Sequence, residues 1–499
     1  MKLPPIFTLL AAVAGFSMAA RAADRPNIVF ILADDLGYAE LGCYGQKKIR
    51  TPRIDALATQ GMRFTRGYSG NAVCAPSRCV LMTGRHPGHA EVRDNRAMQP
   101  EGQYPLTDGA VTLAERLHSL GYASGAFGKW GLGNMESAGN PLKQGFDRFF
   151  GYNCQAHAHS YYPATLWDND SVISLNNVPP IPGHASLADG ADPKDPKSYD
   201  LFKGQDYAPY RVHEQALKFV RDHKDGPFFL YYPSTIPHVA LHVPDKHLAP
   251  YLAEKWIDPP FTREHGGYTP HFTPRAAYAA MISLLDEQVG EVLDLLDELK
   301  LADNTIVVFS SDNGTTHLGE EVDYTFFDSV GALRGLKGSL YEGGIRVPLI
   351  VRWPGKIAAG STSDIVTGFE DWVPTFLDLV GAETPKDESL DGISIAPTLL
   401  GKGSSDREFL YREFPSYGGQ QAVWLGHRWK GIRQNLMAKG KGKAAIPEIK
   451  TELYDLEADV SESKDVAAEH PEILAKIEAL MKSEHTPSEE FRFPALDQN

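Results

Sequence analysis

Residues 26–35 read Pro-Asn-Ile-Val-Phe-Ile-Leu-Ala-Asp-Asp, an unbroken apolar run that ends in two carboxylates. A run without polar alternation is typical of a strand that is buried on both faces of a parallel sheet. Residues 304–309 form a second such run, which leads into Ser-Ser-Asp-Asn-Gly, and residues 347–351 form a third. Ligands collect at the carboxyl ends of strands in such sheets, so these acidic strand ends are candidate site residues.

Helical patterns alternate with the strands. Capped or amphipathic helices are expected at 51–62, 112–120 and 275–299, and further strands at 122–127 and 227–232. This alternation predicts an α/β fold, in which a large central sheet, mixed but mostly parallel, is flanked by helices on both faces.

The chain divides into three predicted parts: a signal peptide over 1–22, a catalytic domain over 23–400 and a C-terminal subdomain over 401–499. Beyond residue 401 several short strand patterns precede one helical pattern, which predicts a smaller α+β subdomain with a short antiparallel sheet. Residues 152–203 are rich in Asn, Pro, Asp and His and have little periodicity. We interpret them as a long functional insertion or surface loop.

The composition excludes several classes of protein. The 499 residues carry a net charge of −15 without a basic block, so nucleic acid is not an expected partner. The four cysteines are Cys43, Cys74, Cys79 and Cys154; if Cys74 is consumed by oxidation an odd number remains, so a disulfide scaffold is not expected. Apolar and charged fractions are ordinary for a globular protein with a large core.

The N-terminus has the pattern of a secretory signal peptide. Lys2 precedes a mostly apolar stretch over 6–20, and Ala20-Arg21-Ala22 fits a small-x-small cleavage site. We therefore expect export to the periplasm or the medium after cleavage near Ala22; the alternative is an uncleaved membrane anchor. No later stretch is long and apolar enough for a membrane span.

Residues 74–78 read Cys-Ala-Pro-Ser-Arg, and Thr-Gly-Arg follows at 83–85. Taken alone, Cys74 could be a small buried residue at the start of a helix. Pro76 suits the first turn of a helix, whose free amides and dipole would face an anion. The sequence context decides between these interpretations.

From Pro26 to about Asp378 the chain resembles the type I, formylglycine-dependent sulfatases of the alkaline phosphatase superfamily. The Cys-x-Pro-Ser-Arg motif is the family's mark for oxidation of the cysteine, and the other motifs follow in family order. The resemblance implies hydrolysis of sulfate esters, and it implies a partner enzyme that converts Cys74 to formylglycine. One hydroxyl of the hydrated aldehyde would attack sulfur, and the second would then drive sulfate off.

The strand ends offer a metal site. Asp34, Asp35, Asp312 and Asn313 provide only hard oxygen ligands, which suit calcium or magnesium rather than zinc. The resemblance implies one Ca²⁺, held by these four side chains and by the modified Cys74.

The resemblance also assigns roles to four cationic side chains. Arg78 is expected to contact the formylglycine and the metal-site carboxylates. Lys129, in the family's Gly-Lys-Trp motif, and Lys337, just before Glu-Gly-Gly-Ile-Arg-Val-Pro at 342–348, are expected to bind sulfate. His238 is the expected general acid for the leaving group.

One position departs from the family pattern. The family reads Gly-Lys-Trp-His-Leu-Gly where residues 128–133 read Gly-Lys-Trp-Gly-Leu-Gly, so the histidine that would hydrogen-bond the formylglycine is replaced by Gly131. We hypothesise that another histidine enters the site in its place. The candidates are His157, His159 and His242.

Specificity is expected from loops above the site. Two groups of polar residues are the candidates for substrate binding: Arg93, Asp94 and Asn95 in one, and His157, His159 and Tyr161 in the other. Export and a single site favour a sulfated carbohydrate, cleaved in exo fashion. The alternatives are a formylglycine-dependent phosphonate or phosphate ester hydrolase of the same superfamily, or a non-catalytic glycan-binding relative.

Overall fold

The computed structural model describes residues 25–99, 101–384, 390–437 and 449–497. The predicted signal peptide lies outside these residues. Within them, no helix combines the length and the apolar character that crossing a membrane requires.

A ten-stranded mixed sheet forms the centre of the molecule, as expected. Its inner strands β9, β1, β8, β4 and β5 are neighbours and all run parallel, whereas β10 is antiparallel to both of its neighbours. The strands in spatial order are β11 (Ser361–Ser363), β2 (Met62–Phe64), β10 (Leu349–Arg352), β9 (Thr305–Ser311), β1 (Asn27–Ala33), β8 (Phe228–Pro233), β4 (Ala123–Lys129), β5 (Arg148–Tyr152), β6 (Thr165–Asp168) and β7 (Ser171–Ser174).

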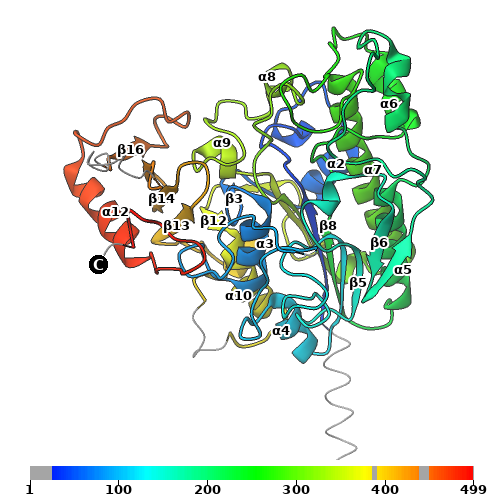
Figure 1. The fold of residues 1–499 in the computed structure, drawn as a ribbon. Coiled ribbons are helices and arrows are strands. Elements are labelled where there is room, and N and C mark those ends of the chain that lie inside the picture. The colour runs from blue at the N-terminus through cyan, green and yellow to red at the C-terminus, as the bar shows by residue number, and fades with distance from the viewer. Residues whose placement is uncertain (1–24, 100, 385–389, 438–448, 498–499) are drawn as a thin grey trace, which may run out of the picture.

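Both faces of the sheet are covered by helices, as the uninterrupted apolar strands predict. Along β1, Val29 and Ile31 point into one buried cluster and Ile28 and Phe30 into another, because successive side chains of a strand face opposite sides. Figure 1 shows α5, α6 and α7 on one side and α3, α4 and α10 on the other. The helices are α2 (Pro52–Gln60), α3 (Cys74–Thr83), α4 (Leu113–Ser119), α5 (Ala208–Asp222), α6 (Asp245–Leu252), α7 (Pro274–Glu298), α8 (Tyr324–Phe327), α9 (Glu342–Ile345), α10 (Trp372–Leu379), α11 (Ala396–Leu399) and α12 (Pro471–Ser483).

Residues 152–203 are more ordered than a surface loop. They contribute β6 and β7, which extend the edge of the main sheet beyond β5 as an antiparallel hairpin. The remainder forms two short 3-10 helices (His157–His159 and Pro196–Phe202) and irregular structure.

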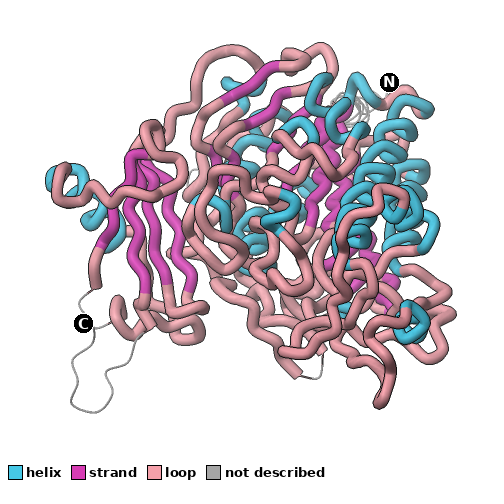
Figure 2. Tube along the Cα trace, turned by 90° about the horizontal axis from the view of Figure 1, so that it is seen from above, coloured by secondary structure: helices cyan, strands magenta, loops and turns pink. Residues whose placement is uncertain are grey.

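The C-terminal region forms a second, four-stranded antiparallel sheet, as expected. It consists of β13 (Phe409–Phe414), β14 (Gln420–Leu425), β15 (Trp429–Gln434) and β16 (Thr451–Asp455), and α12 packs on it through Ile477 and Met481. Figure 2 shows these strands side by side at one side of the main body. A very short parallel pair, β3 (Gly67–Tyr68) with β12 (Thr367–Gly368), forms a separate two-stranded sheet.

Buried ion pairs join the C-terminal sheet to the main body. Arg412 of β13 is fully buried and binds both carboxylate oxygens of Glu370, at 2.9 and 2.8 Å. Lys430 of β15 binds Glu342 at 3.0 Å. Removing one partner of such a pair would leave a buried charge uncompensated, at a cost of about 3–5 kcal/mol. The C-terminal sheet is therefore fixed firmly enough to take part in a site.

Candidate active site

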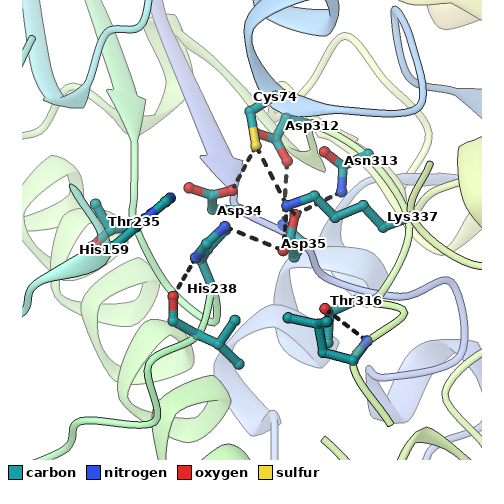
Figure 3. A network of polar contacts seen from close by, with 12 residues as sticks. Asp34, Asp35, Cys74, His159, Thr235, His238, Asp312, Asn313, Thr316 and Lys337 are labelled. Atoms are coloured by element: carbon teal, nitrogen blue, oxygen red, sulfur yellow. Dashed lines mark hydrogen bonds and ion pairs between the residues drawn. The ribbon is translucent and has the colours of Figure 1, made fainter. Parts of the chain in front are cut away.

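Four neighbouring parallel strands bring their carboxyl ends together at one edge of the sheet. Asp34 and Asp35 follow β1, Asp312 and Asn313 follow β9, and Lys129 is the last residue of β4. The loop after β8 carries His238. Figure 3 shows all but Lys129 of these side chains pointing toward one another, which is the arrangement that parallel strand ends favour.

A sharp turn after β1 allows two consecutive carboxylates to serve the same site. Asp35 adopts a left-handed conformation, with φ at 66°, which aspartate tolerates better than most residues. Its backbone N–H donates to Asp312 Oδ1 at 3.2 Å, and the next N–H, of Leu36, donates to Ser311 Oγ at 2.9 Å. The turn is thus tied to the end of β9.

Cys74 is the first residue of α3, so its side chain lies at the N-terminal end of that helix. Its Sγ lies 3.4 Å from Asp34 Oδ1, 3.6 Å from Lys129 Nζ and 3.8 Å from Lys337 Nζ. Burial and the charges of Asp312 and Asp34 raise the pKa of the thiol. A buried, neutral sulfur with two ammonium groups beside it is therefore at the centre of the site.

Arg78 lies one helical turn further along α3 and is completely buried. Its Nη2 donates to Asp312 Oδ2 at 2.7 Å and lies 3.4 Å from Asp34 Oδ2. Burial would raise the pKa of Asp34, but the positive charges, led by Lys129, hold that pKa well below its usual range. For Asp312, burial and the charge of Asp34 prevail over Arg78 and raise the pKa to about 6.

Lys337 and Asn313 both contact Asp35. The lysine Nζ lies 2.7 Å from both carboxylate oxygens, and Asn313 Nδ2 donates to Oδ1 at 2.7 Å. Asn313 is fully buried, yet its Oδ1 has no hydrogen-bond partner in the described part of the chain. This oxygen is available to a ligand.

His238 is positioned by several backbone and ring contacts. Its Nδ1 contacts the carbonyl of Val239, its Nε2 lies 3.6 Å from Asp35 Oδ2, and its ring stacks on His159 with centroids 5.1 Å apart. Tyr161 donates its hydroxyl to the carbonyls of Thr235 and His238, at 2.5 and 2.6 Å. Burial, Lys337 and Lys129 hold the pKa of His238 well below its usual value.

A cavity of about 380 Å³ opens above these groups. We call the polar side chains around and beneath Cys74 the floor: Asp34, Asp35, Cys74, Arg78, Lys129, His238, Asp312, Asn313 and Lys337. We call the loop residues that line the upper cavity the rim: Asp94, Asn95, His159, Tyr268, His317, Ser416 and Tyr417.

Three of the six predicted substrate contacts line the cavity, namely Asp94, Asn95 and His159. The other three do not. The Arg93 guanidinium is buried against Glu413 at 2.7 Å and the carbonyl of Thr486, and His157 pairs with Glu101 at 3.2 Å. Tyr161 is buried beneath the His238 loop. In this structure Arg93, His157 and Tyr161 have structural partners that take up their polar groups, so the geometry does not favour them as substrate contacts.

Gly131 stands where the family has a histidine, and the fold places the histidines that were candidates to replace it in different surroundings. His159 reaches the cavity, whereas His242 lines a different cavity of about 520 Å³. The group closest to Gly131 is instead an amide. A Cβ atom on Gly131 would lie 2.2 Å from Nε2 of Gln155, which also lines the active-site cavity.

Sequence reasoning missed Gln155 and most of the rim. Tyr268, His317 and Tyr417 come from three distant loops, and no local pattern marks them as neighbours. The Ser-Tyr-Gly-Gly turn at 416–419, between β13 and β14, was the one available signal, since Gly-rich turns often carry binding residues.

Comparison with known proteins agrees with the site. Residues 26–382 match the family described as Sulfatase, and residues 336–487 match one described as N-sulphoglucosamine sulphohydrolase, C-terminal. The chain belongs to the sulfatase family. It is accordingly a sulfuric ester hydrolase, as the resemblance implied.

Individual relatives cover nearly the whole chain. It is 30% identical to the N-acetylgalactosamine-6-O-sulfatase of Bacteroides thetaiotaomicron, over 93% of both chains. It is 33% identical to human arylsulfatase A, over 95% of this chain and 90% of the relative. The solved structure of Ps i-CgsB in complex with k-i-k-neocarrahexaose superimposes with a TM-score of 0.74 at 26% identity, over 92% of each chain.

Proposed function

We propose that this sulfatase removes sulfate from a sulfated carbohydrate in exo fashion, with formylglycine at position 74 and one Ca²⁺. One observation carries the proposal. The Cys74 side chain lies at a helix N-terminus, within 3.8 Å of two lysine ammonium groups and beside a cluster of buried carboxylates.

The floor carries the charge that a sulfate ester needs. Three carboxylates, of Asp34, Asp35 and Asp312, face three cations that contact them. A divalent cation would leave a net charge of about +2 in a buried site, where electrostatic interactions are strong. Lys129 and Lys337 are close enough to position 74 to hold the sulfate oxygens beside it.

The residues present fit Ca²⁺. The donors are carboxylate and amide oxygens, and the buried Asn313 Oδ1 lacks a partner in the described part of the chain. Asp34, Asp35, Asp312 and Asn313, together with the modified residue 74, would hold the ion. When bound, it would polarise sulfate oxygens and orient the nucleophile.

The chain's own groups would prepare the nucleophile and the leaving group. Formylglycine, once hydrated, supplies a hydroxyl that can attack sulfur and a second one that can expel sulfate. Arg78 holds Asp34 and Asp312 in place around it. His238 can give a proton to the leaving oxygen from Nε2, since its Nδ1 is turned to the Val239 carbonyl. A bound sulfate monoester anion would favour the imidazolium that this step requires.

The rim favours a sugar as the substrate. Tyr268, Tyr417 and His317 offer aromatic faces, and Asp94 and Asn95 offer polar groups for hydroxyls. The names of two similar proteins, an N-acetylgalactosamine-6-O-sulfatase and a neocarrahexaose complex, support the same class. The signal-peptide pattern over residues 1–22 is consistent with an extracellular or periplasmic glycan as the substrate, and a maturing enzyme would act on Cys74.

The test is sulfate release, measured by ion chromatography, from a panel of sulfated sugars beside matched phosphate and phosphonate esters. Conversion of Cys74 is first verified by peptide mass, and a Cys74→Ala protein serves as the blank. We expect release from one class of sulfated sugar. Turnover of phosphonate esters alone by fully converted protein would overturn the proposal. Binding of glycans without any turnover would favour the non-catalytic alternative.

A further inference from the structure

Gln155 carries a buried amide that has no hydrogen-bond partner among the described residues. It follows β5, its side chain is almost fully enclosed, and neither Oε1 nor Nε2 has a hydrogen-bond partner within the described residues. Burying an amide without hydrogen bonds destabilises a fold, and the great majority of buried polar groups are therefore paired. Such a group in a cavity indicates that a ligand or a modified residue completes its hydrogen bonds.

The position of Gln155 is tied to the strand that carries Lys129. The N–H of Trp130 donates to the Tyr152 carbonyl at 2.8 Å, and the N–H of Gly131 donates to the Asn153 carbonyl at 3.0 Å. The segment before Gln155 therefore runs beside the residues that follow Lys129. Both Gln155 and Cys74 line the active-site cavity.

Gly131 and Gln155 form one arrangement. Gly131 has φ at +82°, a conformation that favours glycine, and a Cβ there would lie 2.2 Å from Gln155 Nε2. The amide thus occupies the space that the Cβ atom of any other residue at position 131 would need. Only glycine at 131 leaves room for it.

We propose that Gln155 is a catalytic residue whose amide hydrogen-bonds the oxygen atoms of the reacting centre, namely the hydroxyls at the modified residue 74 and the sulfate bound there. This inference rests on the proposed function. The amide offers two donors and one acceptor, so it can orient a hydroxyl and a sulfate oxygen together. It does not titrate between pH 4 and pH 10, so its contribution does not vary with pH, unlike that of an imidazole.

The first test replaces the amide without emptying its space. Gln155→Met keeps the length of the side chain and removes all of its hydrogen bonds. We expect kcat to fall by about 10- to 100-fold while KM changes less than about threefold, because a preorganised donor acts on the transition state. Conversion of Cys74 should be complete by peptide mass, and the midpoint of thermal unfolding should not fall, because an unpaired amide has been removed from the interior.

The matched control is Gln144→Met. Gln144 is also buried, and its Oε1 also has no partner in the part of the chain that the structure describes, but it does not line the cavity. Its replacement should leave kcat unchanged per folded molecule. A Gln155→Met protein with kcat within about twofold of the parent would overturn the proposal, and so would an equal loss in both variants.

A second variant separates hydrogen bonding from shape. Gln155→His restores a donor and an acceptor but, unlike the amide, can be protonated. It should recover part of the activity that Gln155→Met loses and add a new limb to the pH–rate profile. Identical rates and profiles for the two variants would contradict a hydrogen-bonding role. An inactive parent protein would refute the proposed function and this inference with it, whereas an active parent with an active Gln155→Met variant refutes this inference alone.

Discussion

The floor and the rim of the cavity are built in different ways. Most floor residues lie at the ends of parallel strands or on the buried first turns of α3, where their neighbours in the sheet fix them. The rim residues lie on loops that are far apart in sequence, and two of them, Ser416 and Tyr417, lie in the turn that joins β13 and β14 of the C-terminal sheet. Rigid elements hold chemical groups more accurately than loops do. The difference suggests that the floor determines the reaction and the rim the substrate.

The largest effect is expected at position 74. Cys74→Ser should lower sustained turnover by at least about 10³-fold, because a serine has one hydroxyl and no internal way to release sulfate. The measurement is sulfate release over many turnovers, with intact mass to detect a trapped ester. Cys79→Ala, on the same helix and equally buried, is the control that should remain active. Sustained turnover by Cys74→Ser would contradict the proposed nucleophile.

Removal of Ca²⁺ should have the next largest effect. A chelator should lower kcat by more than about tenfold, and Ca²⁺ should restore it, because the bound ion is expected to polarise the sulfate oxygens and orient the nucleophile. Thermal unfolding gives an independent readout. Ca²⁺ at 100 times its dissociation constant should stabilise the fold by about 2.7 kcal/mol.

Asn313→Ala supplies the comparison for this effect, since it removes one proposed ligand and leaves the carboxylates. Its unfolding midpoint should respond less to Ca²⁺ than that of the parent protein. Full activity and an unchanged midpoint after exhaustive chelation would exclude a metal from the floor.

Lys337 tests whether the floor also binds the sulfate. Lys337→Met should lower kcat/KM by about 100-fold, which corresponds to about 2.7 kcal/mol, because it removes an ammonium group beside the reacting centre. The exposed Lys356 provides the control substitution. Equal kcat/KM values for Lys337→Met and the parent would mean that Lys337 does not bind the sulfate and only neutralises the charge of Asp35.

The floor could be predicted from the sequence because its signals are local. The apolar run at 26–32 fixes a buried strand, and the carboxylates that follow it must then lie at the carboxyl edge of the sheet. The resemblance added what local patterns cannot provide, namely that Asp312 and Lys337 meet Cys74.

The rest could not be predicted, for physical reasons. β7 is mostly exposed, so it lacks the apolar pattern of a strand and gains its order by pairing with β6. An apolar run does not indicate the direction of a strand, so the antiparallel orientation of β10 could not be predicted. Arg93 seemed suited to a sugar, but a buried Glu413 from the C-terminal sheet binds it. Contacts of this kind depend on how distant segments pack.

Tyr417 tests the role of the rim. This tyrosine is 58% exposed at the mouth of the cavity. Tyr417→Ala should raise KM for a sulfated oligosaccharide by about three- to tenfold, or about 0.7–1.4 kcal/mol, with little change in kcat. A small aryl sulfate, which does not reach the rim, should be hydrolysed as before. Tyr417→Phe keeps the ring and should behave like the parent. An equal loss of activity on both substrates would mean that Tyr417 takes part in the reaction itself. It would weaken the distinction between a floor that determines the reaction and a rim that determines the substrate.

The smallest effect concerns the contacts that hold the subdomain carrying Tyr417. The ring of His485 lies between Glu413 of β13 and Asp497, at 2.7 and 2.9 Å, and packs perpendicular to the ring of Phe493. Burial lowers the pKa of His485, but the two carboxylates outweigh it and raise the pKa above its ordinary value. The folded state therefore binds this proton more tightly than the unfolded state does.

A raised pKa fixes the sign of the pH dependence. The stabilisation by His485 is complete below pH 6.5 and is lost as the pH rises through the higher pKa of the folded state. His485→Gln should lower the unfolding midpoint by about 1–2 °C at pH 5.5 and by less at pH 9, measured at constant ionic strength. Turnover of a small aryl sulfate should be unaffected, since His485 does not line the cavity. A deficit that grows toward alkaline pH would mean that the ring is neutral in the folded protein and that another contact positions the rim.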